Sequence, residues 1–386
     1  MNHSPLPAEL ELGRCLTAEV LVPMKEAFVG KDEIVDLLGV CLVAGENLFL
    51  HGPPGTAKSA LVQDLARRLD GSVFDYLLTR FTEPNELFGP FDIRKLREGD
   101  LVTNTEGMLP EASFVFLDEL LNANSAILNS LLMVLNERVF RRGRETRALP
   151  LVMVVGASNR LPEDDALGAL FDRFLLRVRC DNVPSERLQD VLTAGWKLDL
   201  RQHAPATAFR VDDVRRLNSL LAKTDLNPVR QAYVELVHRL RYAGIVVSDR
   251  RAVKLQRLMA ASALLCGRLD VRVSDLWVLR YIWDTEEQQE ILTSLVGDAL
   301  AKTDGEPQQQ RHPRSQGGDA PDAEALARDL ERIAERLADG SLAVTQRSYV
   351  RDRLGLLAAR CQWVPDEQQR EHLQLRVDEL WEKMGG

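Results

Sequence analysis

A short glycine-rich stretch that ends in a lysine and a serine predicts a definite chemistry. It reads Gly52-Pro53-Pro54-Gly55-Thr56-Ala57-Lys58-Ser59-Ala60, and it follows an apolar run at 48–50 and precedes an amphipathic helical pattern. A glycine-rich turn between a strand and a helix binds phosphate groups through its backbone N–H groups and the helix N-terminus. We expect Lys58 to neutralise the β- and γ-phosphate oxygens of ATP and the Ser59 hydroxyl to bind Mg²⁺.

One position departs from the usual pattern of such loops. Ala57 stands where a second glycine is typical. A methyl group is small enough there if φ is negative, so we expect the loop to keep its function with Ala57 in that conformation.

Polar side chains follow two further apolar runs. Asp118 and Glu119 directly follow the run Phe114–Leu117, and Asp118 lies 60 positions after Lys58. Asn159 follows the run 152–157. We expect Asp118 to hold magnesium through its water shell and Glu119 to polarise the attacking water. At the end of its strand Asn159 reaches the water or the γ-phosphate; the alternative is an ordinary turn-forming asparagine.

The elements that must position these residues alternate between short apolar runs and longer helical patterns. The runs, at 48–50, 73–77, 114–117, 152–157 and 174–178, are nearly unbroken in apolar character, as strands buried on both faces are. This alternation is typical of an α/β fold with a parallel sheet covered by helices. From about 186 to 302 helical spacing replaces it, which predicts a smaller all-helical domain.

The last part of the sequence predicts a linker and a helical bundle. Residues 303–322 lack apolar anchors and are rich in Gly, Pro and Gln, so we expect a flexible linker. Leu326, Leu330, Ile333 and Leu337 recur in steps of 4, 3 and 4, and Leu373, Val377, Leu380 and Met384 repeat those steps. Such stripes predict a hairpin or bundle over 323–386, which we expect to dock a partner rather than to catalyse.

Composition excludes several other classes of protein. The 386 residues carry 49 Lys and Arg against 58 Asp and Glu, so no overall positive charge attracts nucleic acid or anionic lipid. The five cysteines form no C-x-x-C pair, and the six histidines show no metal-ligand spacing. No apolar run approaches the roughly 20 residues of a membrane-spanning helix, and the first 13 residues do not resemble a secretory signal. We expect a cytoplasmic protein without membrane insertion.

The three strand ends and the segments around them resemble a known family. TRFTEPNELFGPFDI, GMLPEASFVFLDELLNANSAILNSLLMVLNER, GASNRLPEDDALGALFDRFLLRV and VSDRRAVK are similar to the MoxR branch of the AAA+ ATPases, closest to regulatory ATPase variant A. The resemblance covers about residues 10–285. It implies an AAA+ core over 1–185 and a helical lid over 186–302.

The resemblance also implies roles for two arginines. Arg173 matches the position from which the family supplies an arginine finger to the neighbouring subunit's nucleotide; a surface ion pair with Asp172 is the alternative. Arg250 matches the second sensor on the lid, and Arg251 is a rival for the same role. A guanidinium beside the γ-phosphate stabilises charge during phosphoryl transfer.

The remaining implications concern adenine, assembly and partners. Val29 and Gly30, followed by Lys31, lie where relatives wrap the adenine. The family implies a hexameric ring that acts as a chaperone-like remodeller, typically with a von Willebrand factor A-domain (vWA) partner. Longer relatives carry a β-rich domain, which the linker at 303–322 is too short to hold. We therefore do not expect this chain to share the partners of that domain.

Two segments resemble inserts of the family and leave alternatives open. Residues 91–109, with a turn at 97–100, predict a hairpin that could project into a central pore. Residues 138–147 carry five arginines around Gly143, and predict a second hairpin that is solvated or contacts a subunit. This basic hairpin motivates one alternative function, a nucleic-acid motor; the other is a nucleotide-dependent scaffold with little turnover.

Overall fold

The computed structural model describes most of the chain. The described residues are 8–98, 101–142, 145–162, 165–200, 209–301, 310–316, scattered positions between 326 and 361, and 367–385. The chain divides into two compact units, Met1–Ser315 and Gln316–Gly386. Each unit is described by itself.

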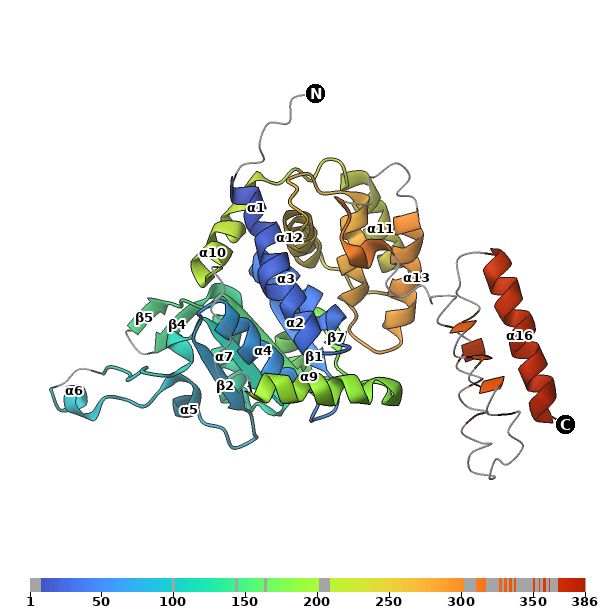
Figure 1. Cartoon of the computed structure of the whole chain (residues 1–386). Coiled ribbons are helices and arrows are strands. Elements are labelled where there is room, and N and C mark those ends of the chain that lie inside the picture. Colours follow the sequence, from blue (N-terminus) through green and yellow to red (C-terminus); the bar gives the residue numbers. More distant parts are fainter. Residues whose placement is uncertain are drawn as a thin grey trace. The chain divides into compact units, whose positions relative to one another are not determined.

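A five-stranded parallel sheet forms the centre of the first unit (Figure 1). Its strands are β1 (Asn47–His51), β2 (Val73–Leu77), β3 (Phe114–Asp118), β6 (Met153–Ser158) and β7 (Phe174–Arg179), in the order β2-β3-β6-β1-β7. The five apolar runs predicted from the sequence are therefore confirmed as strands of an α/β fold. The expectation of burial on both faces is wrong for β2, whose residues are mostly partly or fully exposed, whereas β7 at the other edge of the sheet is buried except at its last residue.

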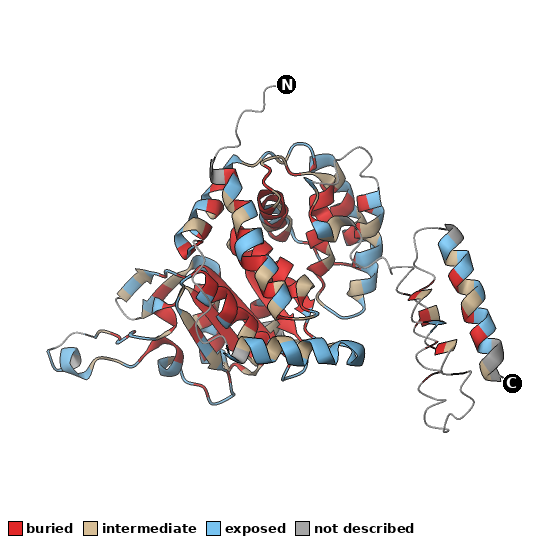
Figure 2. Ribbon diagram, in the orientation of Figure 1, coloured by how far each residue is buried: buried red, intermediate tan, exposed pale blue. Residues whose placement is uncertain are grey.

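Alternate residues of the strands enter two separate cores. In β1, Leu48 and Leu50 pack into the larger core, with α3 (Asp32–Ala44) and α4 (Lys58–Arg68). Phe49 packs into the smaller core, with α7 (Ser125–Glu137) and α8 (Asp165–Phe171). This is the period of two that a strand imposes on its side chains. Figure 2 shows the buried residues gathered in the sheet and along the helix faces that cover it.

The helices and short helical turns around the sheet are α1 (Ala8–Cys15), η1 (Leu16–Leu21), α2 (Val22–Ala27), α3 (Asp32–Ala44), α4 (Lys58–Arg68), α5 (Pro84–Phe88), α6 (Ile93–Arg97), η2 (Leu109–Glu111), η3 (Leu120–Asn122), α7 (Ser125–Glu137), α8 (Asp165–Phe171) and η4 (Ser185–Arg187). The elements that follow are α9 (Leu188–Leu200), α10 (Val211–Leu220), η5 (Leu221–Lys223), α11 (Arg230–Tyr242), α12 (Asp249–Leu265), η6 (Val273–Tyr281), α13 (Gln288–Ala301) and η8 (Pro313–Gln316). Between 186 and 301 the described elements are all helical, as the sequence predicted.

Both predicted hairpins are present. β4 (Val139–Arg142) pairs with β5 (Glu145–Ala148), while Gly143 and Arg144 lie outside the described residues. In the first insert, Phe91 forms an antiparallel bridge with Thr103, and α6 lies near the tip of an arm that extends from the sheet (Figure 1). The predicted turn at 97–100 falls partly on residues 99–100, which are not described.

The second unit contains α16 (Glu367–Gly385), whose residues Leu373, Val377 and Leu380 are buried. They share a core with Leu326, Leu330 and Ile333, the other predicted stripe. A third set with the same steps, Val350, Leu354, Leu357 and Cys361, joins this core. Three stripes around one core are typical of a helical bundle.

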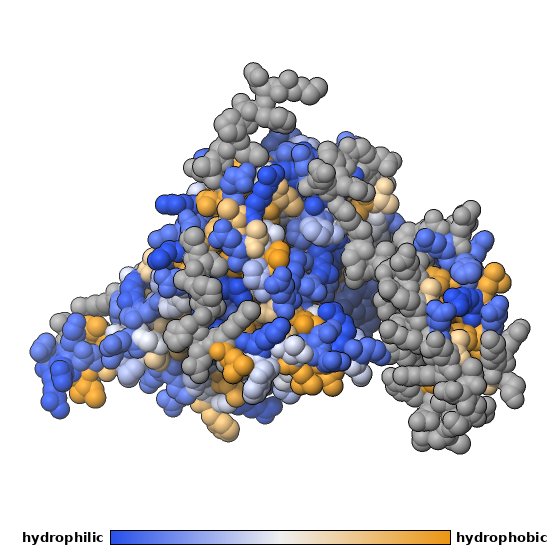
Figure 3. Space-filling model, viewed as in Figure 1, coloured by the Kyte–Doolittle hydropathy of each residue, from blue (hydrophilic) through white to orange (hydrophobic). Residues whose placement is uncertain are grey.

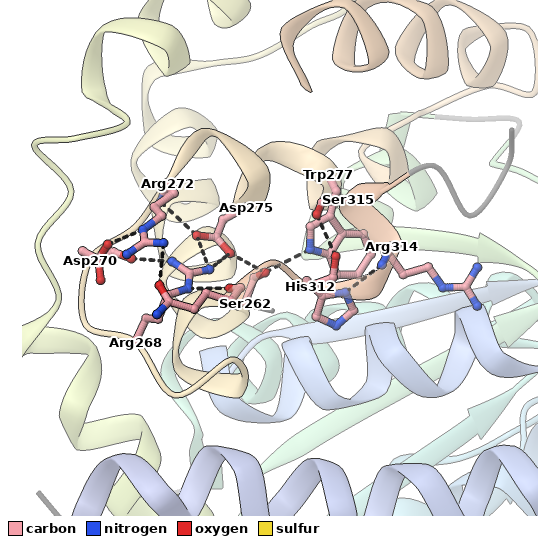
Figure 4. Close-up of polar contacts among 10 residues, drawn as sticks. Ser262, Arg268, Asp270, Arg272, Asp275, Trp277, His312, Arg314 and Ser315 are labelled. Carbon is pink, nitrogen blue, oxygen red and sulfur yellow. Dashed lines mark hydrogen bonds and ion pairs between the residues drawn. The ribbon is translucent and has the colours of Figure 1, made fainter. Parts of the chain in front are cut away.

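The prediction of a flexible linker over 303–322 is wrong for residues 310–316. Arg268 donates from Nε to the Gln310 carbonyl at 2.8 Å, and His312 stacks on Trp277 with ring centroids 4.4 Å apart (Figure 4). Arg314 pairs with the buried carboxylate of Asp36 on α3 at 2.9 Å. We call residues 310–316 the strap. Polar and aromatic contacts hold it, which a search for apolar anchors in the sequence does not detect.

Burial of His312 makes the stability of this unit depend on pH. Desolvation lowers the pKa of His312 from 6.5 to about 4, although Asp36 opposes the shift and Lys25, Arg314 and Arg268 add to it. Since the unfolded chain then binds more protons than the folded one between pH 6.5 and 4, stability must fall as the pH falls through this range. We expect protonation of His312 to lower the free energy of unfolding by about 2–3 kcal/mol over this range.

The measurement is the urea midpoint between pH 7 and 4. His312→Gln should show a flatter decline than the wild type, because glutamine does not take up a proton. His372→Gln, on the exposed face of α16, is the matched control and should decline like the wild type. Parallel curves for all three proteins would contradict the assignment to His312.

Candidate functional site

The phosphate loop, residues 52–59, connects β1 to α4 at the carboxyl edge of the sheet. Gly52 donates its N–H to the Ser158 carbonyl at 3.1 Å. A Cβ on Gly52 would lie 2.4 Å from the Cys180 carbonyl oxygen, so only glycine lets the loop pass this close to the chain that follows β7. Gly55 has a φ of +80°, a conformation that favours glycine. The sequence therefore places glycines where the backbone path requires them.

The expectation of a negative φ at Ala57 is wrong. Ala57 has φ +65° and ψ +26°, in the left-handed region, and is the residue that precedes α4. This conformation places an L-residue side chain too close to its own backbone and costs roughly 1–2 kcal/mol. Ala57 therefore has the left-handed backbone conformation that suits the glycine usual at this position, and it is strained there.

Lys58 and Ser59 begin α4, as predicted. The Lys58 ammonium is buried and donates to the carbonyls of Gly52 and Pro53 at 3.0 and 2.7 Å. The Ser59 hydroxyl lies in the first helical turn, where unpaired backbone N–H groups and the helix dipole attract anions. Thr56 closes the loop, with its hydroxyl donating to Pro53 O at 3.0 Å.

Asp118 and Glu119 lie at the carboxyl end of β3, the strand between β2 and β6. Glu119 has a φ of +50°, which is strained for a residue with a side chain, and its N–H donates to Asp118 Oδ1 at 3.0 Å. Burial and the neighbouring Asp118 carboxylate raise the pKa of Glu119, while Lys58 and Arg160 oppose the rise. Four charged groups from α4, β3 and the end of β6 thus interact at one edge of the sheet.

Asn159 and Arg160 follow β6 at the same edge. Asn159 is exposed directly after the strand, which is the placement that the sequence predicted. Arg160 was missed by the sequence analysis. Its guanidinium donates to the Leu121 carbonyl and to Asn122 Oδ1, and so holds the turn after Glu119. The sequence does show a basic residue directly after the asparagine that ends the strand. The contacts of Arg160, however, depend on the tertiary fold.

Gly30, directly after Val29, lies beside the segment that leaves the sheet after β7. Gly30 has φ +73°, and a Cβ there would approach the Val183 methyl groups to 3.3 Å. The neighbouring Lys31 donates from Nζ to the Asp181 carbonyl. Cys180, one residue earlier, contacts the Thr56 carbonyl through Sγ. These contacts connect the predicted adenine end to the phosphate loop.

Arg173 lies at the amino-terminal ends of the strands, whereas the phosphate loop lies at their carboxyl ends. Its neighbour Phe174 is paired with Asn47, the first residue of β1, and Asn47 donates to the Arg173 carbonyl at 3.2 Å. Five residues of parallel strand separate Asn47 from Gly52, or about 16 Å. The Arg173 guanidinium pairs with Asp172 at 3.2 Å, the contact that the sequence left as an alternative.

The two candidate sensor arginines have different environments. Arg251 is buried and binds Asp284 at 3.0 Å, and Arg177 of β7 binds the same carboxylate at 2.9 Å. Desolvation and the nearby Arg251 lower the pKa of Arg177 to about 9. The Arg250 side chain is exposed and makes no hydrogen bond or ion pair with another described residue. This arrangement leaves Arg250 available to a ligand, whereas Arg251 joins the lid to the sheet.

The donor set is suited to magnesium. Among the described residues no group of three or more His, Cys, Asp or Glu side chains is placed to hold a metal ion. A Ser59 hydroxyl and an Asp118 carboxylate are hard oxygen donors, and Mg²⁺ is commonly held by one or two such groups together with phosphate oxygens. Burial first and the Asp118 carboxylate second raise the pKa of Glu119, and a cation bound between the two carboxylates would oppose that rise. The residues therefore fit the ion.

Comparison with known proteins agrees with this geometry. Residues 14–219 match a family model described as the MoxR domain in the MoxR-vWA-beta-propeller ternary systems, and residues 226–296 match an AAA lid domain. Two uncharacterised proteins of Methanocaldococcus jannaschii are similar to this chain. One is 35% identical over 71% of this chain and 72% of its own length, and the other 36% identical over 68% and 69%.

Two further proteins extend the comparison. Chaperone MoxR1 of Mycobacterium tuberculosis is 27% identical over 63% of this chain and 65% of its own. The crystal structure of a candidate ATPase from Cytophaga hutchinsonii aligns with a TM-score of 0.61 at 19% identity, over 76% of this chain and 96% of its own. The latter likeness shows the fold.

The parallel sheet, phosphate loop, strand-end acids and helical lid together define a P-loop ATPase of the AAA+ class. Within that class, the match over more than half of the sequence shows that the chain belongs to the MoxR family. Among the described helices, none is long and apolar enough to cross a membrane.

The strain at Ala57 predicts an unusual response to glycine. Ala57→Gly should stabilise the protein by up to about 1 kcal/mol, because removal of the left-handed penalty exceeds the extra entropy that glycine loses on folding. Ala57→Val should destabilise it by more than about 1 kcal/mol, since a β-branched residue suits this conformation worst. Urea midpoints measure both changes.

Ala60→Gly is the matched control. Ala60 lies three residues further along, inside α4, where glycine costs roughly 0.5–1 kcal/mol. Opposite signs for the same substitution at 57 and 60 are expected. If Ala57→Gly lowers the midpoint as Ala60→Gly does, Ala57 is not left-handed in solution.

Proposed function

We propose that this chain is an ATP-hydrolysing, magnesium-dependent MoxR motor that works as a chaperone-like remodeller of a partner protein. Lys58 and the loop N–H groups bind the phosphates, and Ser59 and Asp118 hold Mg²⁺, which neutralises phosphate charge when bound. Glu119 orients and polarises the attacking water, and Asn159 contacts that water or the γ-phosphate. Val29 and Gly30 contact the adenine, and Arg250 senses the nucleotide from the lid.

The observation that carries this proposal is the convergence of Lys58, Asp118 and Glu119. They come from separate elements, α4 and β3, yet Glu119 interacts electrostatically with both other groups. A lysine beside two acids after parallel strands supplies positioning and charge stabilisation for phosphoryl transfer. A scaffold that binds nucleotide without turnover does not need a strained Glu119 at this place.

We propose that the active site is completed by a second copy in a ring, with six copies as the family implies. The position of Arg173 supports this. Because the backbone at Arg173 lies about 16 Å along the strand direction from the phosphate loop, we assign it to the nucleotide of a neighbouring copy rather than to that of its own chain. A head-to-tail arrangement that brings one copy's Arg173 to the next copy's loop forms a ring when the rotation between copies closes.

The contacts of the basic hairpin give no support to a nucleic-acid motor. Burial lowers the pKa of Arg138 to about 10, and its guanidinium binds Asn47. Arg142 donates to the Gly89 carbonyl and lies 4.0 Å from the Phe91 ring centroid. Arg147 donates to the Pro110 carbonyl. These three arginines connect the two inserts and the start of β1.

Two further proposals concern the partner of this chain and its place within the family. The matching family model names systems that contain vWA and β-propeller proteins, and we propose a vWA-domain partner on that basis. We also propose that the chain lies near regulatory ATPase variant A within the family, on the motif words quoted from its sequence.

Glu119→Gln tests the chemistry directly. Gln keeps the shape but not the negative charge, so ATP hydrolysis should fall at least about 100-fold while ATP binding persists. The wild-type rate should also decline toward acid at a higher pH than an unperturbed glutamate gives, because the pKa of Glu119 is raised. Phosphate release and binding of a fluorescent ATP analogue report the two steps.

Glu137→Gln, at the end of α7, is the matched control and should keep wild-type turnover. A Glu119→Gln variant that retains more than half of the activity would refute the assigned base. No measurable turnover in the wild-type protein would favour the scaffold.

A further inference from the structure

The helix α9 carries an apolar stripe that its own chain does not cover. Leu188, Leu192, Trp196 and Leu200 follow one another at steps of four and are 54%, 65%, 67% and 66% exposed. We call these four residues the α9 stripe. Steps of four keep side chains on one side of a helix, so the stripe extends about 18 Å.

The opposite side of α9 is the one that packs on the protein. Leu198 contacts the larger core, and α9 packs against α2. Figure 2 shows α9 exposed or half-buried along its length, and Figure 3 shows apolar side chains along it on the face in view. A helix with apolar residues on both sides is suited to a second packing partner. Three leucines and a tryptophan in one exposed row are typical of an interaction surface.

The position of α9 in the chain connects it to the nucleotide. After β7 the chain passes Cys180, which contacts the phosphate loop, and then Val183, which lies beside Gly30. The Arg187 guanidinium lies 3.8 Å from a Cβ placed on Gly30, and α9 begins at the next residue. The α9 stripe therefore starts at the nucleotide edge, where a second copy must approach to deliver Arg173.

We infer that the α9 stripe is an interface for a second copy of this chain, the copy whose Arg173 completes the ATP site. This inference rests on the proposed function, because only an active site shared between copies requires a neighbour at this edge. An apolar, charge-free row suits an interface that stays covered, since permanent interfaces are more apolar than transient ones.

The test compares assembly and turnover in Leu192→Glu with those in the wild type. A glutamate there would be buried without a partner in the assembled state, so half-maximal assembly should need at least about tenfold more protein. ATP hydrolysis per chain should fall with assembly, while binding of the ATP analogue to the single chain should stay unchanged. Trp196→Ala should weaken assembly in the same direction by removing the largest side chain of the row.

Leu375→Glu is the matched control, because Leu375 is also a helical leucine and is also 65% exposed, on α16. It should assemble like the wild type. Light scattering measures assembly, and thermal midpoints confirm that each variant is folded.

The outcomes separate the two proposals. If the wild type assembles and hydrolyses ATP, and Leu192→Glu and Trp196→Ala do both normally, the interface is overturned and the proposed function stands. If light scattering finds only single chains of the wild type under conditions in which it hydrolyses ATP, the shared site and the interface both fail. If the wild type assembles but does not hydrolyse ATP, loss of assembly in Leu192→Glu, with normal assembly of Leu375→Glu, still supports the interface although the proposed function fails.

Discussion

The parallel register of the neighbouring strands β3, β6, β1 and β7 determines where the groups of the candidate ATP site lie. Parallel strands bring their carboxyl ends to one edge, so Lys58, Asp118, Glu119 and Asn159 meet there although they are far apart in sequence. The same register places Arg173 at the other edge, beside Asn47. One geometric rule therefore gathers the groups that we propose act on ATP and separates Arg173 from them, and on our account a neighbouring copy supplies that arginine.

The lid is attached to this frame through polar contacts of the buried side chains Arg177, Arg251 and His51, and not through apolar packing alone. Arg177 of β7 and Arg251 of α12 share the Asp284 carboxylate, and His51, directly before the phosphate loop, contacts Glu286 at 3.1 Å. Truncation of one partner in such a network leaves a buried charge unpaired. The strap adds a connection between the lid and α3. These contacts form a short connection between the phosphate loop and the lid.

The sequence predicts most of the fold and much of the site, because these depend on local patterns. Five apolar runs, a glycine-rich loop and two acids at a strand end are visible in the sequence without knowledge of neighbours. The errors and omissions arise where tertiary contacts decide. The backbone of Ala57 follows the loop rather than the preference of alanine, and residues 310–316 dock through Gln310, His312 and Arg314 instead of apolar anchors. Likewise, Arg160 gains its place only when β3 and β6 lie side by side.

The central claim is that each ATP site combines residues of two chains, and a mixture of two inactive variants tests it most directly. Glu119→Gln retains Arg173 but lacks the base, and Arg173→Ala retains the base but lacks the arginine. In rings that assemble at random from equal amounts, about one site in four pairs an intact base with an intact arginine. We expect the mixture to recover about a quarter of the wild-type ATPase rate per chain. A mixture no more active than the mean of its two components would contradict the shared site.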